Sequence, residues 1–274
     1  MCGTGRNDSP PSPAHLGIPP VSGGELKGGW HNRYVQQANW TRELRAYLFK
    51  EAGLDQASRA LEVGCGTGAI LSEISTPATV HGLDIQFASL KEAKSNILIS
   101  PPLTCGDAFS LPYAIESFEV VFCHFLLLWL PHPLDAIREM TRVTKAGGDI
   151  IAFAEPDYNH RVDKPAALEP LGKWQRDALR RQGADPGIGE NLAELFFEAG
   201  INIIEAGAIS KEGSDPLSEE ERELEWAILE SDLAGQIADE RLQKLNALDK
   251  AAWLNGERVL YVPTHYIWGR TAVG

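Results

Sequence analysis

Cysteine is scarce in this chain of 274 residues, and its four cysteines, Cys2, Cys65, Cys105 and Cys123, share no close spacing. A disulfide framework or a structural zinc site requires paired spacings, so we interpret these residues as free thiols. Other metal-ligand patterns are missing as well, because the seven histidines are scattered and no Asp-Asp pair occurs. We therefore predict that the protein uses no metal.

Long apolar runs are also missing. The longest is Val120–Leu130, which His124 interrupts, whereas a membrane-spanning helix needs about 20 residues. The first residues, Met1–Arg6, contain no apolar stretch of the kind found in a secretory signal. We therefore expect a cytoplasmic protein without a membrane partner.

Positive charge is in short supply, because 25 Lys and Arg stand against 38 Asp and Glu, a net charge of −13. Proteins that bind nucleic acid need a basic stripe to neutralise phosphates. The sole basic doublet of the sequence is Arg180-Arg181. These features argue against DNA or RNA as a partner.

Glycine, proline and serine dominate residues 1–29, a composition that cannot bury enough apolar surface to fold. We predict a disordered tail there and a single domain over residues 30–274. A helix is expected from about Tyr34, because apolar residues recur on one helical face between Trp40 and Leu48.

Strand and helix patterns then alternate along the chain, which is typical of an α/β fold. Short apolar strands are predicted at 60–63, 80–84, 103–105, 118–123, 149–154, 201–209 and 264–270. Helices are predicted at 69–74, 90–96, 134–143, 165–182, 191–199, 218–233 and 238–254. The order implies a doubly wound, mostly parallel sheet, with helical additions at about 155–190 and 212–257.

The most informative stretch is the strand and glycine turn Leu61-Glu62-Val63-Gly64-Cys65-Gly66-Thr67-Gly68. Closely spaced glycines after a strand let the backbone approach a ligand, and Asp84 ends the next strand, where an acid can accept hydrogen bonds from a ribose. Gly64, Gly66 and Ala69 also satisfy the relaxed dinucleotide fingerprint.

Three features favour S-adenosylmethionine over a dinucleotide. Glu62 suits the amino-acid end of that cofactor and would face a pyrophosphate poorly. Gly68 adds a third glycine at regular spacing, and Asp107 follows the third strand, where an acid can accept from the adenine amino group.

With these motifs, and with the later turn Ala146-Gly147-Gly148, the chain resembles the class I S-adenosylmethionine-dependent methyltransferases. The resemblance is good over about residues 30–155 and loose over about 190–270. It implies a seven-stranded sheet whose last strand runs antiparallel.

The resemblance also implies which residues bind the cofactor. It places Gly64 and Gly66 under the methionine part, Asp84 on the ribose hydroxyls, Ile85 on the adenine face, and Asp107 with Ala108 at the adenine edge. It places His124 near the methyl-donor face, and Tyr34 over the cofactor carboxylate.

Acceptor contacts are expected at the carboxyl ends of the strands. Tyr158 and His160 follow the fifth strand and are candidates for contacting the acceptor, and an ordinary polar loop is the alternative. Trp174 is a candidate pocket wall, although a Trp at helical spacing also suits a core. His124 is a candidate general base, and the alternative is that it only lines the site.

The predicted function is S-adenosylmethionine-dependent transfer of a methyl group to a small-molecule acceptor, whose acceptor atom (O, N, S or C) stays open. One alternative is a cofactor-binding protein of the same fold with other chemistry, such as a lyase, cyclase or regulator. Another is a nicotinamide-dependent oxidoreductase. The late helices, which carry Trp226 and Trp253, are expected either to cap the site or to form a homodimer.

Overall fold

The computed structural model describes residues 29–98, 101–209 and 218–273. The predicted tail therefore lies outside the described residues, apart from Gly29, the first residue of a helix. Among the helices described, none is long and apolar enough to cross a membrane.

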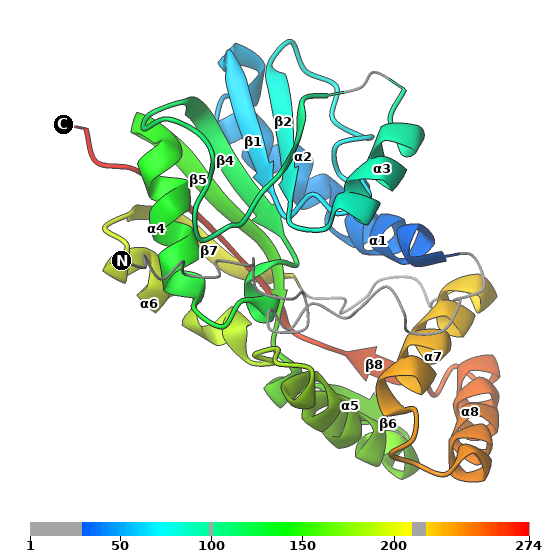
Figure 1. The fold of residues 1–274 in the computed structure, drawn as a ribbon. Coiled ribbons are helices and arrows are strands. Elements are labelled where there is room, and N and C mark those ends of the chain that lie inside the picture. The colour runs from blue at the N-terminus through cyan, green and yellow to red at the C-terminus, as the bar shows by residue number, and fades with distance from the viewer. Residues whose placement is uncertain (1–28, 99–100, 210–217, 274) are drawn as a thin grey trace, which may run out of the picture.

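A seven-stranded sheet with strand order β3-β2-β1-β4-β5-β9-β7 forms the centre of the molecule (Figure 1). Its strands are β1 (Arg59–Val63), β2 (Thr79–Asp84), β3 (Leu103–Cys105), β4 (Phe118–His124), β5 (Thr144–Pro156), β7 (Asn202–Ile209) and β9 (Thr264–Arg270). The pairs from β3 to β5 are parallel, and β9 runs antiparallel to both β5 and β7. The predicted fold class, with its antiparallel last strand, is confirmed.

The side chains of each central strand alternate between the two faces of the sheet, and helices cover both faces, so the strand is buried on both. In β4, Val121 and Cys123 face one apolar cluster, whereas Val120 and Phe122 face the other. Helices α4 (Pro133–Val143) and α6 (Ile188–Glu198) cover the first face. Helices α1 (Gly29–Trp40), α2 (Arg42–Glu51) and α3 (Phe87–Asn96) cover the second.

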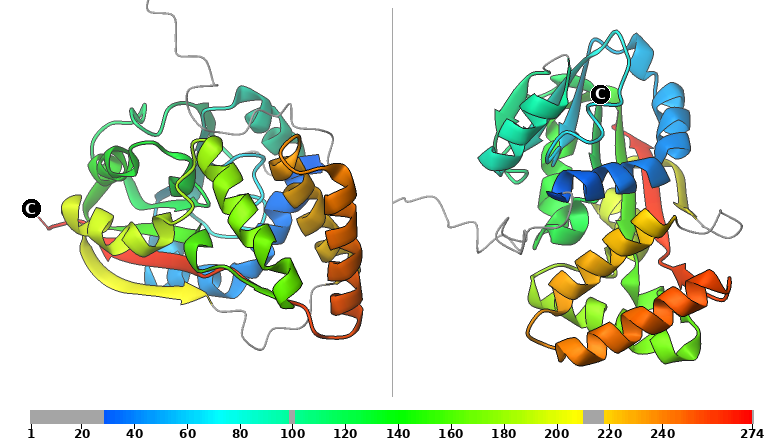
Figure 2. Two further views of the ribbon diagram at one scale, coloured as in Figure 1. Left: turned by 90° about the horizontal axis from the view of Figure 1, so that it is seen from below. Right: turned by 90° about the vertical axis from the view of Figure 1, so that its right-hand side faces the viewer.

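A helical lobe lies beyond the carboxyl ends of the parallel strands (Figures 1 and 2). It consists of α5 (Glu169–Arg181), α7 (Glu219–Leu233), α8 (Asp239–Leu254), and a small antiparallel pair, β6 (Val162–Lys164) with β8 (Val259–Tyr261). Leu168, Leu171, Trp226 and Leu233 are among the side chains that form its own apolar core.

The expected helix at residues 69–74 is wrong, because that segment forms successive turns. One α-type bond closes there, from the Ser72 N–H to the Gly68 carbonyl at 2.9 Å. The first helical turn is costly to form, and the segment has no room to continue because Pro77 soon follows.

Three smaller differences concern the boundaries of two helices and one additional pair of strands. The expected helix from Tyr34 is two helices that meet at Thr41. The helix expected from residue 165 begins with a short 3₁₀ turn, Ala166–Leu168, before α5. The pair β6 and β8 was not predicted, since each has three residues and gains its hydrogen bonds only from the other.

Candidate active site

The glycine turn after β1 needs glycine for two separate reasons. Gly64 and Gly66 have positive φ angles of 77° and 50°, which side chains rarely adopt. A Cβ on Gly64 would also lie 2.7 Å from Leu126 Cδ1. The turn is tied to β2, because the N–H groups of Gly64 and Cys65 both donate to the Leu83 carbonyl.

Asp84, at the end of β2, bonds directly to this turn. Its Oδ2 accepts from the Gly66 N–H at 2.9 Å, and its Oδ1 accepts from the Gln86 N–H at 2.7 Å. Burial raises the pKa of Asp84, and the two N–H donors oppose that rise. A carboxylate has about four acceptor sites, so two remain for the paired hydroxyls of a ribose.

Glu62 is the most unusual carboxyl group of the site. Glu62 is 2% exposed, and its Oε2 atom has no hydrogen-bond partner. Burial raises the pKa of Glu62 to about 8, although the nearby Arg45 charge opposes the rise. A buried acid that lacks a partner fits a ligand with an ammonium group, as the amino-acid end of S-adenosylmethionine has.

Helix α1 crosses the glycine turn and brings Tyr34 against it. A Cβ on Gly66 would lie 3.9 Å from the Tyr34 ring. Burial, followed by the negative charge of Asp84, raises the pKa of Tyr34 to about 12, so the phenol keeps its proton. Tyr34 therefore lies beside the glycine turn, and its closure over the cofactor carboxylate stays a prediction.

Three polar residues at the turn were missed by sequence reasoning. His31 Nδ1 lies 2.8 Å from Thr67 Oγ1, and Asn96 Nδ2 lies 3.0 Å from the same His31 nitrogen and donates to the Thr67 carbonyl at 3.1 Å. They come from α1, the turn and α3. No local sequence pattern connects these elements, and only the packing of α1 brings the residues together.

His124 ends β4, and its Nε2 lies 3.0 Å from Thr41 Oγ1. Burial, and then the charge of Arg45, lowers the pKa of His124 to about 3. The ring is therefore neutral at pH 7, as expected, but a conjugate acid that strong makes it a poor proton acceptor. Arg45 was not singled out from the sequence, and its guanidinium donates to Thr41 Oγ1 and pairs with Glu73 at 2.5 Å.

Glu155, at the end of β5, fixes the loop beyond His124. Its Oε1 accepts from the N–H groups of Leu126 and Leu127 at 3.0 and 2.9 Å, and its Oε2 accepts from Leu128 at 3.1 Å. Burial raises the pKa of Glu155, and the three donors oppose the rise. The carboxyl thereby caps the 3₁₀ helix η3 (Leu127–Trp129), whose preceding residue Leu126 touches the glycine turn.

The residues expected around adenine follow β2 and β3. Ile85 is partly exposed directly after Asp84. Asp107 Oδ1 accepts from the Phe109 N–H at 2.9 Å. Ala108 is packed into the core, so its backbone is the part left to contact a ligand.

The residues expected to contact the acceptor, Tyr158, His160 and Trp174, do not lie together in the structure. Tyr158 is partly buried, and its pKa, raised to about 12 mainly by burial, also responds to the charges of Arg33, Glu225 and Arg161. Trp174 instead packs against the core of the helical lobe, with the Arg241 guanidinium 4.5 Å from its ring centre. The role of Trp174 as a pocket wall stays a prediction.

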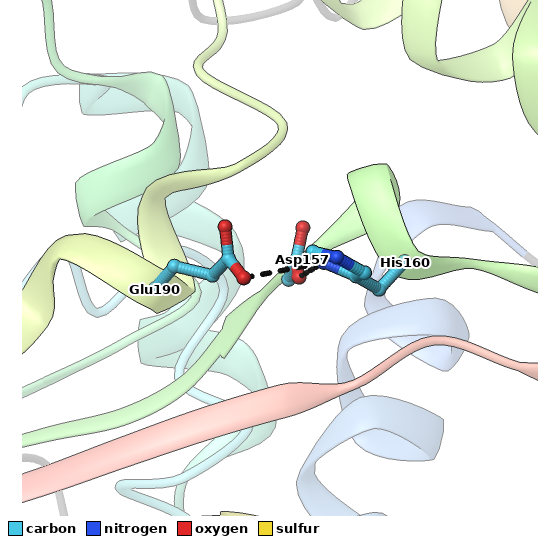
Figure 3. Close-up of side chains that lie close together, drawn as sticks. All are labelled: Asp157, His160 and Glu190. Atoms are coloured by element: carbon cyan, nitrogen blue, oxygen red, sulfur yellow. Dashed lines mark hydrogen bonds and ion pairs between the residues drawn. The ribbon is translucent and has the colours of Figure 1, made fainter.

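His160 belongs to a separate surface cluster (Figure 3). Its Nδ1 lies 2.5 Å from Asp157 Oδ2 and 3.2 Å from Glu190 Oε1. The hydrogen bond to Asp157 is the main reason that the pKa of His160 is raised. One nitrogen or oxygen atom of each side chain lies within 4.8 Å of the others, an arrangement that could also hold a metal ion. The expectation that the protein uses no metal therefore stays a prediction.

Comparisons with known proteins agree with this geometry. A family model described as "Methyltransferase domain" matches residues 61–152. The chain is 34% identical over 179 residues to a demethylmenaquinone methyltransferase of Staphylococcus haemolyticus, covering 58% of this chain and 75% of the relative. The chain belongs to the S-adenosylmethionine-dependent methyltransferases. A demethylmenaquinone methyltransferase of Geobacillus kaustophilus is 30% identical over 186 residues, covering 59% of this chain and 78% of the relative.

Solved structures show the same fold. The YcgJ protein of Bacillus subtilis is 18% identical with a TM-score of 0.53, covering 84% of this chain and 98% of that one. The N-methyltransferase NodS of Bradyrhizobium japonicum, in complex with S-adenosyl-L-homocysteine, is 16% identical with a TM-score of 0.50, covering 85% and 87%. At these identities the likeness shows the fold alone.

This methyltransferase thus uses S-adenosylmethionine as its methyl donor. The oxidoreductase alternative drawn from the glycine fingerprint is not supported by these relatives. Glu62 and Asp84 fit the cofactor, because one has an unpartnered buried oxygen and the other has two free acceptor sites.

Proposed function

We propose that the acceptor binds between the carboxyl ends of the parallel strands and the helical lobe, and that demethylmenaquinone is the first compound to test. The observation that carries this placement is the position of Glu62 and Asp84. Both lie at strand ends under α1, on the side of the sheet where the lobe is added. The choice of compound rests on the names of two relatives.

Each proposed cofactor residue contacts the part of the cofactor that suits its chemistry. Glu62 pairs with the ammonium group and Asp84 with the ribose hydroxyls, while Gly64 and Gly66 allow close backbone approach. Ile85, Asp107 and Ala108 surround the adenine, and Tyr34 closes the site from α1. S-adenosylmethionine supplies, when bound, a sulfonium methyl group that a nucleophile can take.

The protein's part in the reaction is then alignment and exclusion of water. The neutral ring of His124 lines the site, held by Thr41, and its low pKa argues against removal of a proton from the acceptor. This assignment favours an acceptor atom that is nucleophilic without help.

The packing of the late helices favours the capping role over a homodimer interface. Trp226 of α7 lies in the core shared with α5, and α7 is joined to α1 through the Arg33–Glu225 ion pair. We also propose that the protein works in the cytoplasm, without nucleic acid or membrane as a partner, in line with its net charge of −13.

The test is release of S-adenosylhomocysteine, measured by mass spectrometry with methyl-labelled cofactor and a panel of acceptors that begins with demethylmenaquinone. Label in the acceptor supports the proposal. If calorimetry shows cofactor binding but no acceptor in the panel is labelled, the acceptor class is wrong. If cofactor is consumed by a different reaction, the alternative of non-methyl-transfer chemistry is favoured.

A further inference from the structure

Three side chains of metal-binding type converge beyond the end of β5, outside the residues assigned to the cofactor (Figure 3). Asp157 directly follows β5, His160 ends the short 3₁₀ helix η4 (Tyr158–His160), and Glu190 lies in the first turn of α6. His160 Nδ1 lies 2.5 Å from Asp157 Oδ2 and 3.2 Å from Glu190 Oε1. The cluster therefore unites one nitrogen and two oxygen donors from three separate segments.

The start of α6 reaches this point because two glycines let it approach the end of β5 closely. A Cβ on Gly189 would lie 2.6 Å from the Glu155 carbonyl oxygen, and a Cβ on Gly187 would clash with Asn159 Nδ2. Close packing of the backbone thus fixes where Glu190 begins, and its carboxylate has only to turn toward the loop after β5.

The carboxylate of Asp157 supplies a separate argument, because it is buried without a permanent counter-charge. Asp157 is 1% exposed, and its Oδ1 accepts from the Asn159 N–H at 2.9 Å. Among the ion pairs of the described residues, its one partner is His160, which is charged only when protonated and whose side chain is 61% exposed. Buried charges in proteins are paired or coordinate metals. Asp157 Oδ2 therefore faces a position that suits a cation.

The donor set selects the kind of ion. One imidazole nitrogen with two carboxylate oxygens suits zinc, whereas magnesium and calcium prefer oxygen ligands alone. Zinc lies about 2.0–2.2 Å from such atoms, so its ligand atoms are roughly 3.4 Å apart in a tetrahedron. Shifts of about 1 Å would bring His160 and Glu190 to that spacing, and both can move because their side chains are 61% and 49% exposed.

We propose that Asp157, His160 and Glu190 bind a zinc ion that joins the η4 segment to α6. The ion replaces the proton that joins the His160 ring to Asp157. The Asn159 N–H orients the Asp157 carboxylate, as hydrogen bonds to metal-binding carboxylates commonly do. Three protein ligands leave one zinc position for water, and the exposed side chains give the ion a path from solvent.

This proposal departs from the expectation, drawn from the sequence, that the protein uses no metal. Glu190 lies on a helix that no local pattern connects to the loop after β5, so sequence spacing could not bring the three donors together. The site is separate from the residues assigned to S-adenosylmethionine, and the proposal does not depend on which acceptor is methylated.

Calorimetry on the metal-free full chain tests the site, with zinc as the probe and magnesium as the comparison ion. We expect one zinc ion to bind at the cluster at least a hundredfold more tightly than magnesium. Glu190→Gln and His160→Asn change exposed side chains, and each should weaken zinc binding at least about tenfold. Asp157→Asn keeps an acceptor for the Asn159 N–H and should have the same effect, while thermal unfolding without zinc checks that this variant folds.

Matched variants separate the cluster from other zinc-binding groups. Glu194→Gln, farther along α6, and His132→Asn both change exposed residues and should leave zinc binding unchanged. Cys105→Ser should also leave it unchanged, although this exposed thiol is a natural zinc ligand. Zinc should raise the Tm of the parent protein but not that of the His160→Asn, Glu190→Gln double variant, because the ion stabilises only the folded state.

A zinc-soaked crystal measured at the zinc absorption edge should place the ion between the three side chains. Zinc binding that survives in the double variant, or that is lost in Cys105→Ser, would overturn the proposal. Equal affinity for zinc and magnesium, or binding only at millimolar zinc, would identify an adventitious ion and overturn it as well.

Discussion

Asp84 is bonded to the glycine turn and is proposed to bind the ribose of the cofactor, so its removal should have two consequences. A charge-assisted hydrogen bond contributes about 1.5–3 kcal/mol, and Asp84→Ala should therefore weaken S-adenosylmethionine binding at least tenfold. It should also loosen the turn, because the Gly66 N–H loses its acceptor. Calorimetry measures the first effect and thermal unfolding the second.

The exposed Asp135 of α4 provides a matched control, and Asp135→Ala should leave both quantities unchanged. Asp84→Asn keeps one acceptor oxygen and should retain more of the turn's stability than Asp84→Ala. An unchanged dissociation constant in Asp84→Ala would reject the ribose assignment.

The proposed pairing of Glu62 with the cofactor's ammonium group predicts that cofactor binding depends on pH. Its pKa of about 8 leaves the carboxyl protonated at pH 7 in the free protein, whereas pairing with an ammonium group requires the carboxylate. Binding should then release most of one proton at pH 7, and affinity should rise roughly tenfold from pH 6 to pH 7 and fall again above pH 8, where the ammonium group of the ligand loses its own proton. Calorimetry in buffers of different ionisation enthalpy measures the released proton.

Glu62→Gln should abolish this proton release and flatten the pH profile. The same raised pKa has a consequence for the free protein, because stability present below pH 4.5 is lost as pH rises through about 8. Above that pH, the free Glu62→Gln protein should therefore unfold at a higher temperature than the parent. If the parent releases no proton on binding, Glu62 does not hold the ammonium group.

At the scale of elements, the carboxyl group of Glu155 accepts three hydrogen bonds from the segment Leu126–Leu128, which begins η3. Glu155→Ala leaves three N–H groups of the η3 segment without an acceptor, and each unsatisfied buried group costs about 1–3 kcal/mol. We expect the free energy of unfolding to fall by roughly 3 kcal/mol or more, measured by urea denaturation. Glu194→Ala, at an exposed position of α6, should change it by less than about 0.5 kcal/mol. A small loss at Glu155 would mean that water replaces the carboxylate.

The elements that the sequence predicted correctly are those whose local pattern agrees with their packing. Phe118–His124 is apolar on both faces because it lies in the middle of a parallel sheet. Residues 69–74 show the opposite case, since their helical pattern could not overcome the cost of nucleation in so short a segment. The β6 and β8 pairing depends on residues nearly 100 positions apart, which no local pattern records.

The same distinction separates the site residues. Glu62 and Asp84 were predictable because each ends a strand at a fixed distance from the glycine turn. His31, Asn96 and Arg45 were not, because their positions depend on how α1, α2 and α3 pack against the sheet.

At the scale of the whole molecule, the disorder of residues 1–29 remains a prediction that rests on their composition. Proline and glycine there limit the apolar surface that the segment can bury. Deletion of residues 1–25 should therefore change Tm by less than about two degrees, which for a domain of this size is at most about 1 kcal/mol. A loss of several degrees in differential scanning calorimetry would show that the segment packs on the body.

The helical lobe is joined to the sheet domain by the Arg33–Glu225 ion pair, whose side chains are 7% and 19% exposed. Solvent screens so buried a pair weakly, and Gln36 adds a hydrogen bond to the Glu221 carbonyl at 3.4 Å. A double-mutant cycle of Arg33→Ala and Glu225→Ala should therefore give a coupling energy of about 1–3 kcal/mol in urea denaturation. The Lys250–Glu219 pair is the matched control, because its side chains are 44% and 57% exposed and it joins two helices of the lobe to each other. Its cycle should give less than about 0.5 kcal/mol. Similar coupling energies in the two cycles would mean that the Arg33–Glu225 pair does not hold the lobe against α1.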